Sequence, residues 1–599
     1  MDIMKPIASA DIPHGDEWMY EVKYDGFRCI LQWGIAEIKL TSRNNKDLTD
    51  KFPEIINYCR EKQEMMIDFL PLKLDGELVI LNNPYQANFP WIQKRGRLKS
   101  NNSILQKSEE RPATLMVFDL LQHKGENLYS ESFQYRKKRL NEVFIKASLD
   151  SRVRLVEAYE NPTDLWKTVY DYKGEGMIAK RKTSVYSDGK QHRDWYKIKN
   201  WRTIKGFLTY MDMDNGYFTV GVYDGEAIKK IGKCKHGLDE ESMNTLKQIF
   251  LRKGDRQGNG YTLLPAICAL INTLDLYEGE LREASYQQLL PTLKPDECTI
   301  EQLNLDMAMI PLTIELTNTN KIFWPDKGLT KGDLLTYMRE VSPYMLPFLN
   351  GKALTVIRAP DGVQGENFFQ KNLPSYAPSF IETAEVERDQ LIVCNTLDTL
   401  VWFANHGAIE YHVPFQKIDS KHPNEIVFDL DPPSREKFEL AIHAALIIKP
   451  LLDELNLISF VKTSGNKGLQ IHIPIPEGSM TYKETALFTQ AIAWTVEDAY
   501  PHLFTTERLK KNRQGRLYID YVQHGKDKTL IAPYSPRKTI DATVATPLYW
   551  KEVKKGLVPD QFTIPHVIER IQMLGCPFEK YFDVGMAQEM EMVLKMVKT

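Results

Sequence analysis

The sequence predicts a multidomain protein that combines α+β and α/β parts. A chain of 599 residues is too long for one hydrophobic core, so we expect three or four domains. Residues 1–202 mix short strand-like runs with a few helices, and residues 203–290 are β-rich with Asn-Gly and Asp-Gly turn signals. From residue 312 on, strands alternate with long helices, which is typical of a sheet covered by helices.

The segments follow one another in a simple order. In the first domain, 1–202, residues 74–81 and 114–121 are apolar strand-like runs, and 133–144 form a charged helix. Residues 203–290 suit a small β-barrel. The polar, proline-containing stretch 291–311 is predicted to be a linker, and 312–599 form the last domain.

Composition points to a globular protein of a reducing compartment. Hydrophobic residues make up 43% of the chain, but no run of about 18 apolar residues could span a membrane, and the N-terminus lacks a signal-peptide core. The seven cysteines are scattered without a CxxC pair, which argues against a disulfide framework and a zinc site. We therefore expect a cytoplasmic protein with no membrane partner.

The net charge of −3 does not by itself suggest a nucleic-acid partner, but the charge is unevenly distributed. Nine lysines and arginines lie between Lys180 and Lys205, interleaved with aromatic residues, and a second basic cluster, 94–99, follows Trp91. Such patches either neutralise nucleic-acid phosphates or form an ordinary solvated face.

A first candidate site centres on Lys23 in the segment EVKYDGFR, Glu21–Arg28. A lysine amine attacks a phosphate only when deprotonated, and an isolated KxDG pattern equally fits an exposed lysine–aspartate pair. Further motifs follow in order: TSRN (41–44), LDGE (74–77), VFDLL (117–121), EGMIAK (175–180) and WYKIK (195–199). In order and spacing they resemble the nucleotidyltransferase core of ATP-dependent DNA ligases, in which an OB-fold barrel follows this core.

The resemblance implies that Lys23 carries AMP through a phosphoramidate bond, which the DNA 3′-hydroxyl later displaces from the adenylated 5′-phosphate. Phe118 would stack on the adenine, or it is a core aromatic residue. Other matching positions imply contacts with ATP, AMP or a metal: Glu21 near the adenine amino group, Glu77 on the ribose, Arg28 and Arg43 on the ribose or nick phosphates, Glu175 on a metal, and Lys180, Lys197 and Lys199 on the α-phosphate. Lys197 and Lys199 share one face of a strand, as a two-pronged clamp requires.

The sequence departs from the ligase pattern at the end of the barrel. There the family carries a basic motif, usually with an arginine, that orients the pyrophosphate. Residues 287–297 contain no arginine, and Lys294 or Arg282 is the alternative. This departure bears on self-adenylation and not on the nick-sealing architecture.

A second candidate site centres on Asp429 and Asp431 in IVFDLDPP, 426–433. Both carboxylates lie on one face of an apolar strand, and Asp520 in another apolar strand is the third acid. Such a set suits two divalent metals at a phosphoryl transfer, Mg²⁺ or Mn²⁺. With TSGNKGLQIHIPI (463–475) and APYSPR (532–537), the set resembles the archaeo-eukaryotic primase superfamily, in particular the polymerase domain of bacterial DNA ligase D.

This second resemblance implies how an incoming nucleoside triphosphate is held. Ser464, Lys467 and Gly468 would cradle the triphosphate, and Arg537 would clamp it. Where the family usually has a histidine, this chain has Gln470. His472 lies on the same strand face and either reaches a phosphate or is a satisfied structural histidine.

The same family recognises a DNA 5′-phosphate at a gap or break. Asn318, Lys321 and Lys331 match that pocket, although Lys331 equally fits the start of a helix. Phe368 and Phe369 match an aromatic pair that stacks on the template.

Together the motifs resemble the bacterial DNA ligase D family, with the ligase part first and the primase-type polymerase part second. This implies an ATP-using enzyme that fills gaps or extends ends and seals nicks in non-homologous end joining, acting in the cytoplasm at the nucleoid on double-stranded DNA with the Ku homodimer. Two alternatives stay open: an RNA ligase or capping-type nucleotidyltransferase, because these share the lysine motif, and a largely non-catalytic end-bridging scaffold, because the arginine and the histidine are missing.

Overall fold

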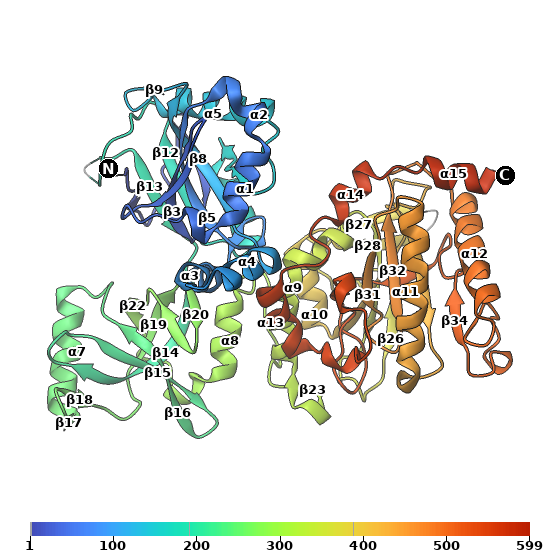
Figure 1. The fold of residues 1–599 in the computed structure, drawn as a ribbon. Helices are drawn as coiled ribbons and strands as arrows, with labels where there is room; N and C mark the ends of the chain where they lie inside the picture. Colours follow the sequence, from blue (N-terminus) through green and yellow to red (C-terminus); the bar gives the residue numbers. More distant parts are fainter. Residues whose placement is uncertain (1–2, 191, 387–388, 599) are drawn as a thin grey trace. The chain divides into compact units, whose positions relative to one another are not determined.

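The computed structural model divides into two units, residues 1–307 and 308–599, each with its own sheets (Figure 1). It describes residues 3–190, 192–386 and 389–598. Among these, none of the helices is long and apolar enough to cross a membrane.

The first unit begins with a five-stranded sheet that carries most of the first candidate site. Its order is β1 (Ile7–Ala8), β13 (Trp195–Lys199), β12 (Gly176–Arg181), β2 (Trp18–Lys23) and β11 (Ala158–Tyr159). Helix α6 (Pro162–Asp171) covers one face by packing Leu165 and Val169 against Trp18 and Tyr20 of β2. The opposite face is left for polar side chains.

A second, six-stranded sheet completes the nucleotidyltransferase-like part. It contains β10 (Val153–Leu155), β8 (Thr114–His123), β5 (Leu72–Val79), β3 (Phe27–Trp33) and β4 (Ile38–Ser42), with β9 (Glu126–Asn127) beside β8. Its core includes apolar residues of α1 (Pro53–Glu61) and α5 (Phe133–Lys146). The smaller elements are α2 (Gln63–Met66), α3 (Phe89–Arg97), α4 (Asn101–Glu110) and the pair β6 (Leu81–Asn83) and β7 (Gln86–Ala87).

Residues 202–289 build a seven-stranded antiparallel sheet around a separate core. Its strands are β14 (Arg202–Asp212), β15 (Phe218–Asp224), β16 (Ala227–Cys234), β17 (Asp255–Gln257), β18 (Gly260–Thr262), β19 (Cys268–Thr273) and β22 (Ser285–Leu289). Helix α7 (Glu240–Lys253) adds Leu246 and Phe250 to the core. The hairpin of β20 (Asp275–Tyr277) and β21 (Glu280–Arg282) lies between β19 and β22 along the chain.

The stretch 291–311 differs from the linker that its composition predicts. It contains helix α8 (Ile300–Ala308), and Cys298 and Leu303 are fully buried in the core of the barrel sheet. Asp306 also accepts a hydrogen bond from the main-chain N–H of Lys205 at 3.0 Å. These contacts join most of the stretch to the first unit, whereas the finer domain boundaries remain predictions.

The second unit has two six-stranded sheets. One contains β27 (Thr383–Val386), β28 (Asp389–Val393), β25 (Ala353–Arg358), β29 (Ala408–Pro414) and β35 (Thr529–Ile531), with β26 (Phe368–Gln370) beside β25. The other contains β33 (Phe504–Thr505), β34 (Leu517–Asp520), β30 (Glu425–Asp431), β32 (Leu469–Pro474), β31 (Phe460–Thr463) and β36 (Pro547–Leu548). The pair β23 (Ile322–Trp324) and β24 (Leu329–Thr330) lies near the start.

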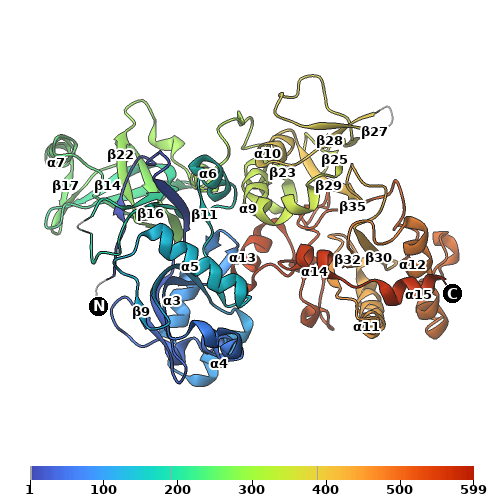
Figure 2. The ribbon, with the colours of Figure 1, turned by 90° about the horizontal axis from the view of Figure 1, so that it is seen from above.

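Helices cover these sheets and decide which strand face stays polar. Phe428 of β30 packs edge-on against Phe488 of α12 (Tyr482–Ala499), with ring centroids 6.2 Å apart. Asp429 and Asp431 therefore project from the other face. The remaining helices are α9 (Lys331–Leu349), α10 (Leu397–Asn405), α11 (Phe438–Glu454), α13 (Ile564–Leu574), α14 (Tyr581–Ala587) and α15 (Glu591–Lys598), the last of which packs beside α12 (Figure 2).

Candidate functional site

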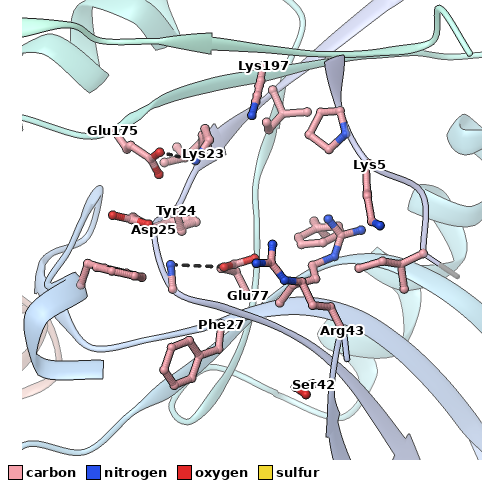
Figure 3. Close-up of a pocket in the computed structure, with 18 of the residues that line it drawn as sticks. Lys5, Lys23, Tyr24, Asp25, Phe27, Ser42, Arg43, Glu77, Glu175 and Lys197 are labelled. Carbon is pink, nitrogen blue, oxygen red and sulfur yellow. Dashed lines mark hydrogen bonds and ion pairs between the residues drawn. The ribbon is translucent and has the colours of Figure 1, made fainter. Parts of the chain in front are cut away.

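A cavity of about 1080 Å³ opens between the two sheets of the first unit (Figure 3). It gathers Lys23 and all nine residues predicted to bind ATP or AMP: Glu21, Arg28, Arg43, Glu77, Phe118, Glu175, Lys180, Lys197 and Lys199. Four further cations in the lining were given no individual role from the sequence, namely Lys5, Lys46, Arg97 and Lys190. No motif singled these out.

The cations of the first site stand in a row because three neighbouring strands are in register. Lys23 of β2 and Lys199 of β13 both lie opposite Gly176 of β12, and Lys197 lies opposite Ile178. A side chain at Gly176 would place its Cβ 2.1 Å from the carbonyl oxygen of Ile198, and its φ of +152° suits glycine. The row therefore has no side chain between Lys23 and Lys199, and the predicted shared face of Lys197 and Lys199 is present.

Lys23 donates a hydrogen bond to Glu175, and Figure 3 shows these side chains meeting in the cavity. Burial alone would lower the pKa of Lys23, but the negative charges of Glu175 and Asp25 outweigh it and raise the pKa above its usual value. Lys23 is therefore held protonated in this state. Glu175 Oε2 is buried without a hydrogen-bond partner among the described residues.

At the other end of the cavity, Glu21 is buried between two lysines. Its carboxylate lies 2.5 Å from Lys137 Nζ and 2.6 Å from Lys180 Nζ. Burial lowers the pKa of Lys180 to about 8, although Glu21 opposes the shift. The Lys180 ammonium also lies 4.4 Å from the ring centre of Phe118. The structure thus groups Lys180 with Glu21 and Phe118, the predicted adenine-binding residues, and Lys137 was not predicted.

Arg28 is engaged by a residue that the sequence reading left without a role. Both its Nε and its Nη2 donate to Asp75 at 2.6 Å, and Tyr186 donates its hydroxyl to the same carboxylate at 2.7 Å. The Arg28 guanidinium lies 4.4 Å from the ring centre of Phe118. Arg28 therefore supports the cavity wall beneath Phe118.

Glu77 faces the cavity and accepts a hydrogen bond from the main-chain N–H of Gly26 at 3.2 Å. Burial raises the pKa of Glu77 to about 8, although Arg28 and Lys23 oppose the shift. The carboxyl group is therefore largely protonated at neutral pH and can donate as well as accept a hydrogen bond.

The barrel part supplies two further lining residues, Arg282 and Glu283. Arg282 Nη2 lies 2.7 Å from Asp25 Oδ2, and Glu283 is paired with Lys199. Lys294, the alternative cation, is not among the lining residues, and its main-chain N–H donates to Glu297 at 2.9 Å.

In the second unit, the three predicted carboxylates come from adjacent strands. Asp429 of β30 lies directly opposite Asp520 of β34, and Asp431 is two residues further along β30. Burial, together with Asp520 and Asp431, raises the pKa of Asp429 to about 7 against the hydrogen bond from Gln470. Within the described ranges, no three His, Cys, Asp or Glu side chains are already arranged as a metal site.

The side chains around these carboxylates are partly cations. Asp431 lies 2.9 Å from Lys467 Nζ and 3.3 Å from Arg513 Nη1. Asp520 accepts hydrogen bonds from the Tyr518 hydroxyl at 3.0 Å and from the main-chain N–H of Gln523 at 2.9 Å. Arg513 was not predicted, because it lies in a loop without a recognisable motif.

The loop between β31 and β32 packs closely on β30. Ser464 Oγ accepts a hydrogen bond from the N–H of Gly468 at 3.0 Å, and a Cβ at Gly468 would lie 2.3 Å from Leu430 O. Arg537 Nη1 lies 3.1 Å from Glu410 Oε2, and its buried Nε has no hydrogen-bond partner among the described residues. The loop and Arg537 meet at Gly465, where a Cβ would lie 2.6 Å from Arg537 Cγ.

His472 lies in the core of the second unit, and its role at a phosphate stays a prediction. His472 is buried and its Nδ1 lies 2.9 Å from Glu425 Oε2, within a set that includes Tyr581, whose hydroxyl donates to the same oxygen at 2.7 Å. Gln470 instead faces the carboxylates: its Nε2 donates to Asp429 at 3.1 Å, and Lys462 Nζ donates to its Oε1 at 2.5 Å. The other ring nitrogen of His472, Nε2, is buried without a hydrogen-bond partner among the described residues.

Near the start of the second unit, residues 318–321 line a small hollow. Lys321 Nζ lies 2.5 Å from Asp361, and Lys331 Nζ donates to Thr317 Oγ1 at 3.1 Å. Burial and the charge of Lys321 lower the pKa of Lys331 to about 8. Lys331 is also the first residue of α9. A place at the start of a helix and a place in the predicted 5′-phosphate pocket are therefore compatible.

Phe368 and Phe369 are exposed on β26, at 45% and 73%. Arg358 supports Phe368, with its guanidinium 5.2 Å from the ring centre. Successive side chains of a strand point to opposite faces, so each exposed ring offers its own surface on which a base can stack.

Comparison with known proteins places this pair of sites in a family. The family described as "ATP dependent DNA ligase domain" matches residues 3–199, and "LigD, primase-polymerase domain" matches residues 330–578. The bifunctional non-homologous end joining protein LigD of Bacillus subtilis is 41% identical over 99% of both chains. The chain belongs to the LigD family.

Other LigD relatives are more distant. The multifunctional non-homologous end joining protein LigD of Pseudomonas aeruginosa is 24% identical over 94% of this chain and 70% of its own. The solved polymerase domain of Mycobacterium tuberculosis ligase D, in complex with DNA, is 30% identical over 45% of this chain and 97% of its own, with a TM-score of 0.43.

Membership in the LigD family confirms the predicted multidomain fold and the predicted activity. This LigD-family chain is a bifunctional DNA repair enzyme of non-homologous end joining, with an ATP-dependent DNA ligase part followed by a primase-polymerase part. The RNA-side and non-catalytic alternatives are set aside, because both parts match DNA-repair enzymes along the whole chain.

Proposed function

We propose that the first unit seals DNA nicks through Lys23 and that the second unit fills gaps or extends ends through Asp429, Asp431 and Asp520. The observation that carries this proposal is the charge arrangement: a row of lysines in one cavity and a set of facing carboxylates in the other unit. The lysines suit the phosphates of ATP, and the carboxylates suit a metal-dependent nucleotidyl transfer.

Sealing begins with Lys23. Its neutral amine attacks the α-phosphorus of ATP, an N–P bond forms, and the bond to pyrophosphate breaks. The proton of Lys23 must first leave, and Glu175 is the base in contact with it. AMP then passes from Lys23 to the DNA 5′-phosphate, and the 3′-hydroxyl displaces it to form the phosphodiester bond.

The other cavity residues hold ATP around this reaction. Lys197 and Lys199 bind its phosphates, Glu77 binds the ribose hydroxyls, and Arg43 binds the ribose or the nick phosphate. Phe118 stacks on the adenine, and Arg28 supports that ring from below. Glu21 and Lys180 form the polar end of the adenine pocket.

Arg282 takes the place of the missing barrel arginine. It lines the cavity, whereas Lys294 does not, and it already pairs with Asp25 two residues from Lys23. We assign to Arg282 the orientation of the pyrophosphate during self-adenylation.

Both sites fit a divalent metal, Mg²⁺ or Mn²⁺. Glu175 has a buried oxygen without a partner among the described residues. Asp429 lies opposite Asp520 and accepts a hydrogen bond from the side-chain amide of Gln470. Carboxylate oxygens are the ligands that these metals prefer. When bound at Asp429, Asp431 and Asp520, the metal supplies charge neutralisation for the triphosphate and lowers the pKa of the 3′-hydroxyl. Asp431 has to exchange Lys467 and Arg513 for the metal.

The incoming nucleotide is held beside these carboxylates. Ser464, Lys467 and Gly468 present a loop to its phosphates, and Arg537 adds a cation whose Nε is free to donate within the described part of the chain. Lys467 pairs with Asp431, and it would be free to contact the triphosphate if that carboxylate held a metal.

DNA is recognised beside the break. Asn318, Lys321 and Lys331 bind the 5′-phosphate, and Phe368 and Phe369 stack on the template. The family further suggests the Ku homodimer as partner. A cytoplasmic location at the nucleoid agrees with the seven cysteines, all free and buried.

One experiment tests the whole proposal. A gapped duplex with a 5′-phosphate is incubated with the protein, ATP, labelled nucleotides and Mg²⁺ or Mn²⁺, and extension and sealing are followed together. We expect the gap to be filled and the product then sealed. The proposal would be contradicted if the protein sealed RNA in preference to DNA, or if neither extension nor sealing occurred.

A further inference from the structure

The corner between β21 and β22 carries two charged residues into the ATP cavity. Arg282 Nη2 is held 2.7 Å from Asp25 Oδ2, and its guanidinium lies 4.3 Å from the ring centre of Phe89. These contacts keep the corner at the cavity independently of its neighbour, Glu283. Glu283 itself has a φ of +51°, a left-handed conformation unusual for a residue with a side chain.

The carboxylate of Glu283 lies among the lysines assigned to the ATP phosphates. It pairs with Lys199, whose side chain is 12% exposed. Burial by itself would raise the pKa of Glu283, but the hydrogen bond and charge of Lys199, with the charges of Lys23 and Lys197, lower it. A side-chain anion thus stands where the cations of the cavity are concentrated.

We propose that Glu283 is an internal competitor of the triphosphate in the ATP site, whose carboxylate holds Lys199 until a triphosphate displaces it. This inference rests on the proposed role of the first cavity as the ATP site. A triphosphate brings several negative charges to the lysine row and replaces one carboxylate, whereas adenosine brings none and leaves the Lys199–Glu283 pair intact. The Arg282–Asp25 pair keeps the corner at the cavity during the exchange.

The test compares wild type with Glu283→Gln, which removes the charge and keeps the shape. Glu280→Gln, an exposed residue of the same hairpin, is the matched control. Binding of inorganic tripolyphosphate, which lacks the nucleoside, is measured by calorimetry, and covalent labelling by α-labelled ATP is measured over a range of ATP concentrations.

We expect Glu283→Gln to bind tripolyphosphate about two- to fivefold more tightly, the range that an ion pair with an exposed partner is worth. The ATP concentration for half-maximal labelling should fall by a similar factor, adenosine should inhibit both proteins equally, and Glu280→Gln should match wild type. Unchanged or weaker tripolyphosphate binding by Glu283→Gln overturns the inference. If wild-type protein binds tripolyphosphate but takes no label from ATP, the proposed role of Lys23 is contradicted instead. The comparison of tripolyphosphate binding by wild type and Glu283→Gln still tests the role of Glu283.

Discussion

Lys23 must lose a proton before its nitrogen can attack a phosphorus atom, and the charges around it oppose that loss. Glu175 and Asp25 raise its pKa, so the ammonium form dominates before ATP and a metal bind. A cation that engages Glu175 removes this opposition. In the proposed mechanism, the pair would therefore keep Lys23 protonated until ATP and a metal bind.

The identity of the nucleophile is tested by replacing Lys23. Lys23→Ala should abolish covalent labelling by α-labelled ATP and nick sealing, because it removes the amine that donates a hydrogen bond to Glu175. Lys23→Arg, which keeps the positive charge, should also take no label. Gel autoradiography measures both, and label on either variant would rule out Lys23.

A second residue-scale prediction concerns pH. Lys331, with a pKa lowered to about 8, is charged below that pH and loses its charge above it. The preference for filling a gap with a 5′-phosphate over one with a 5′-hydroxyl should thus be at least about tenfold near pH 7, from contacts of roughly 1.5–3 kcal/mol each. It should decline as the pH rises through about 8. Rates at subsaturating DNA report the free enzyme.

The ratio of the two substrates cancels other effects of pH on the polymerase. Replacing Lys321 and Lys331 by alanine should remove the preference at every pH and leave addition on an open primer-template unchanged. A wild-type ratio near one at pH 7 would reduce both lysines to ordinary charges.

Single residues show where sequence reasoning succeeds and where it fails. Lys23 and Asp429 were predicted because their motifs are local and strand alternation places them on one face. The contact of His472 with Glu425 could not be predicted, because the two residues lie 47 positions apart in the chain. Asp75, Lys137 and Arg513 were missed for the same reason: their partners are set by the fold and not by spacing.

At the scale of elements, the register between neighbouring strands brings site residues together. Lys23 and Lys199 are far apart in the sequence, yet both lie opposite Gly176. The strands themselves were predictable from their alternation, but their order in the sheet was not. The predicted linker contains helix α8, which packs on the barrel core. Composition did not reveal this short helix, because polar and proline residues in the stretch outweigh its few buried apolar ones.

Helix α8 gives a prediction about stability. Leu303 is fully buried in the barrel core, so Leu303→Ala should destabilise the first unit by roughly 2–5 kcal/mol through loss of apolar contact and a remaining cavity. Leu312→Ala, at a fully exposed position, should change little. Chemical denaturation of the full chain, followed with the labelling reaction, measures both. Equal stability of the two variants would return the stretch to a linker.

At the scale of the molecule, each unit contains one complete candidate site. Every residue assigned to sealing lies in 1–307, and every residue assigned to nucleotide addition lies in 308–599. The motifs were readable from the sequence because the residues assigned to each site fall within one half of the chain. The two activities should therefore be separable by mutation.

This separation predicts that two defective proteins complement each other. Lys23→Ala should fill gaps without sealing, and Asp429→Ala combined with Asp431→Ala should seal ready-made nicks without filling gaps. A mixture of the two should convert a gapped duplex into sealed product, because the filled intermediate can dissociate from one protein and bind the other. The mixture should be slower than wild type at low protein concentration, since two encounters are needed. Denaturing gels of a labelled gapped duplex measure the filled and the sealed product. The double aspartate variant must still seal ready-made nicks in the same assay. A mixture that then yields filled but unsealed product would show that filling and sealing must occur within one chain.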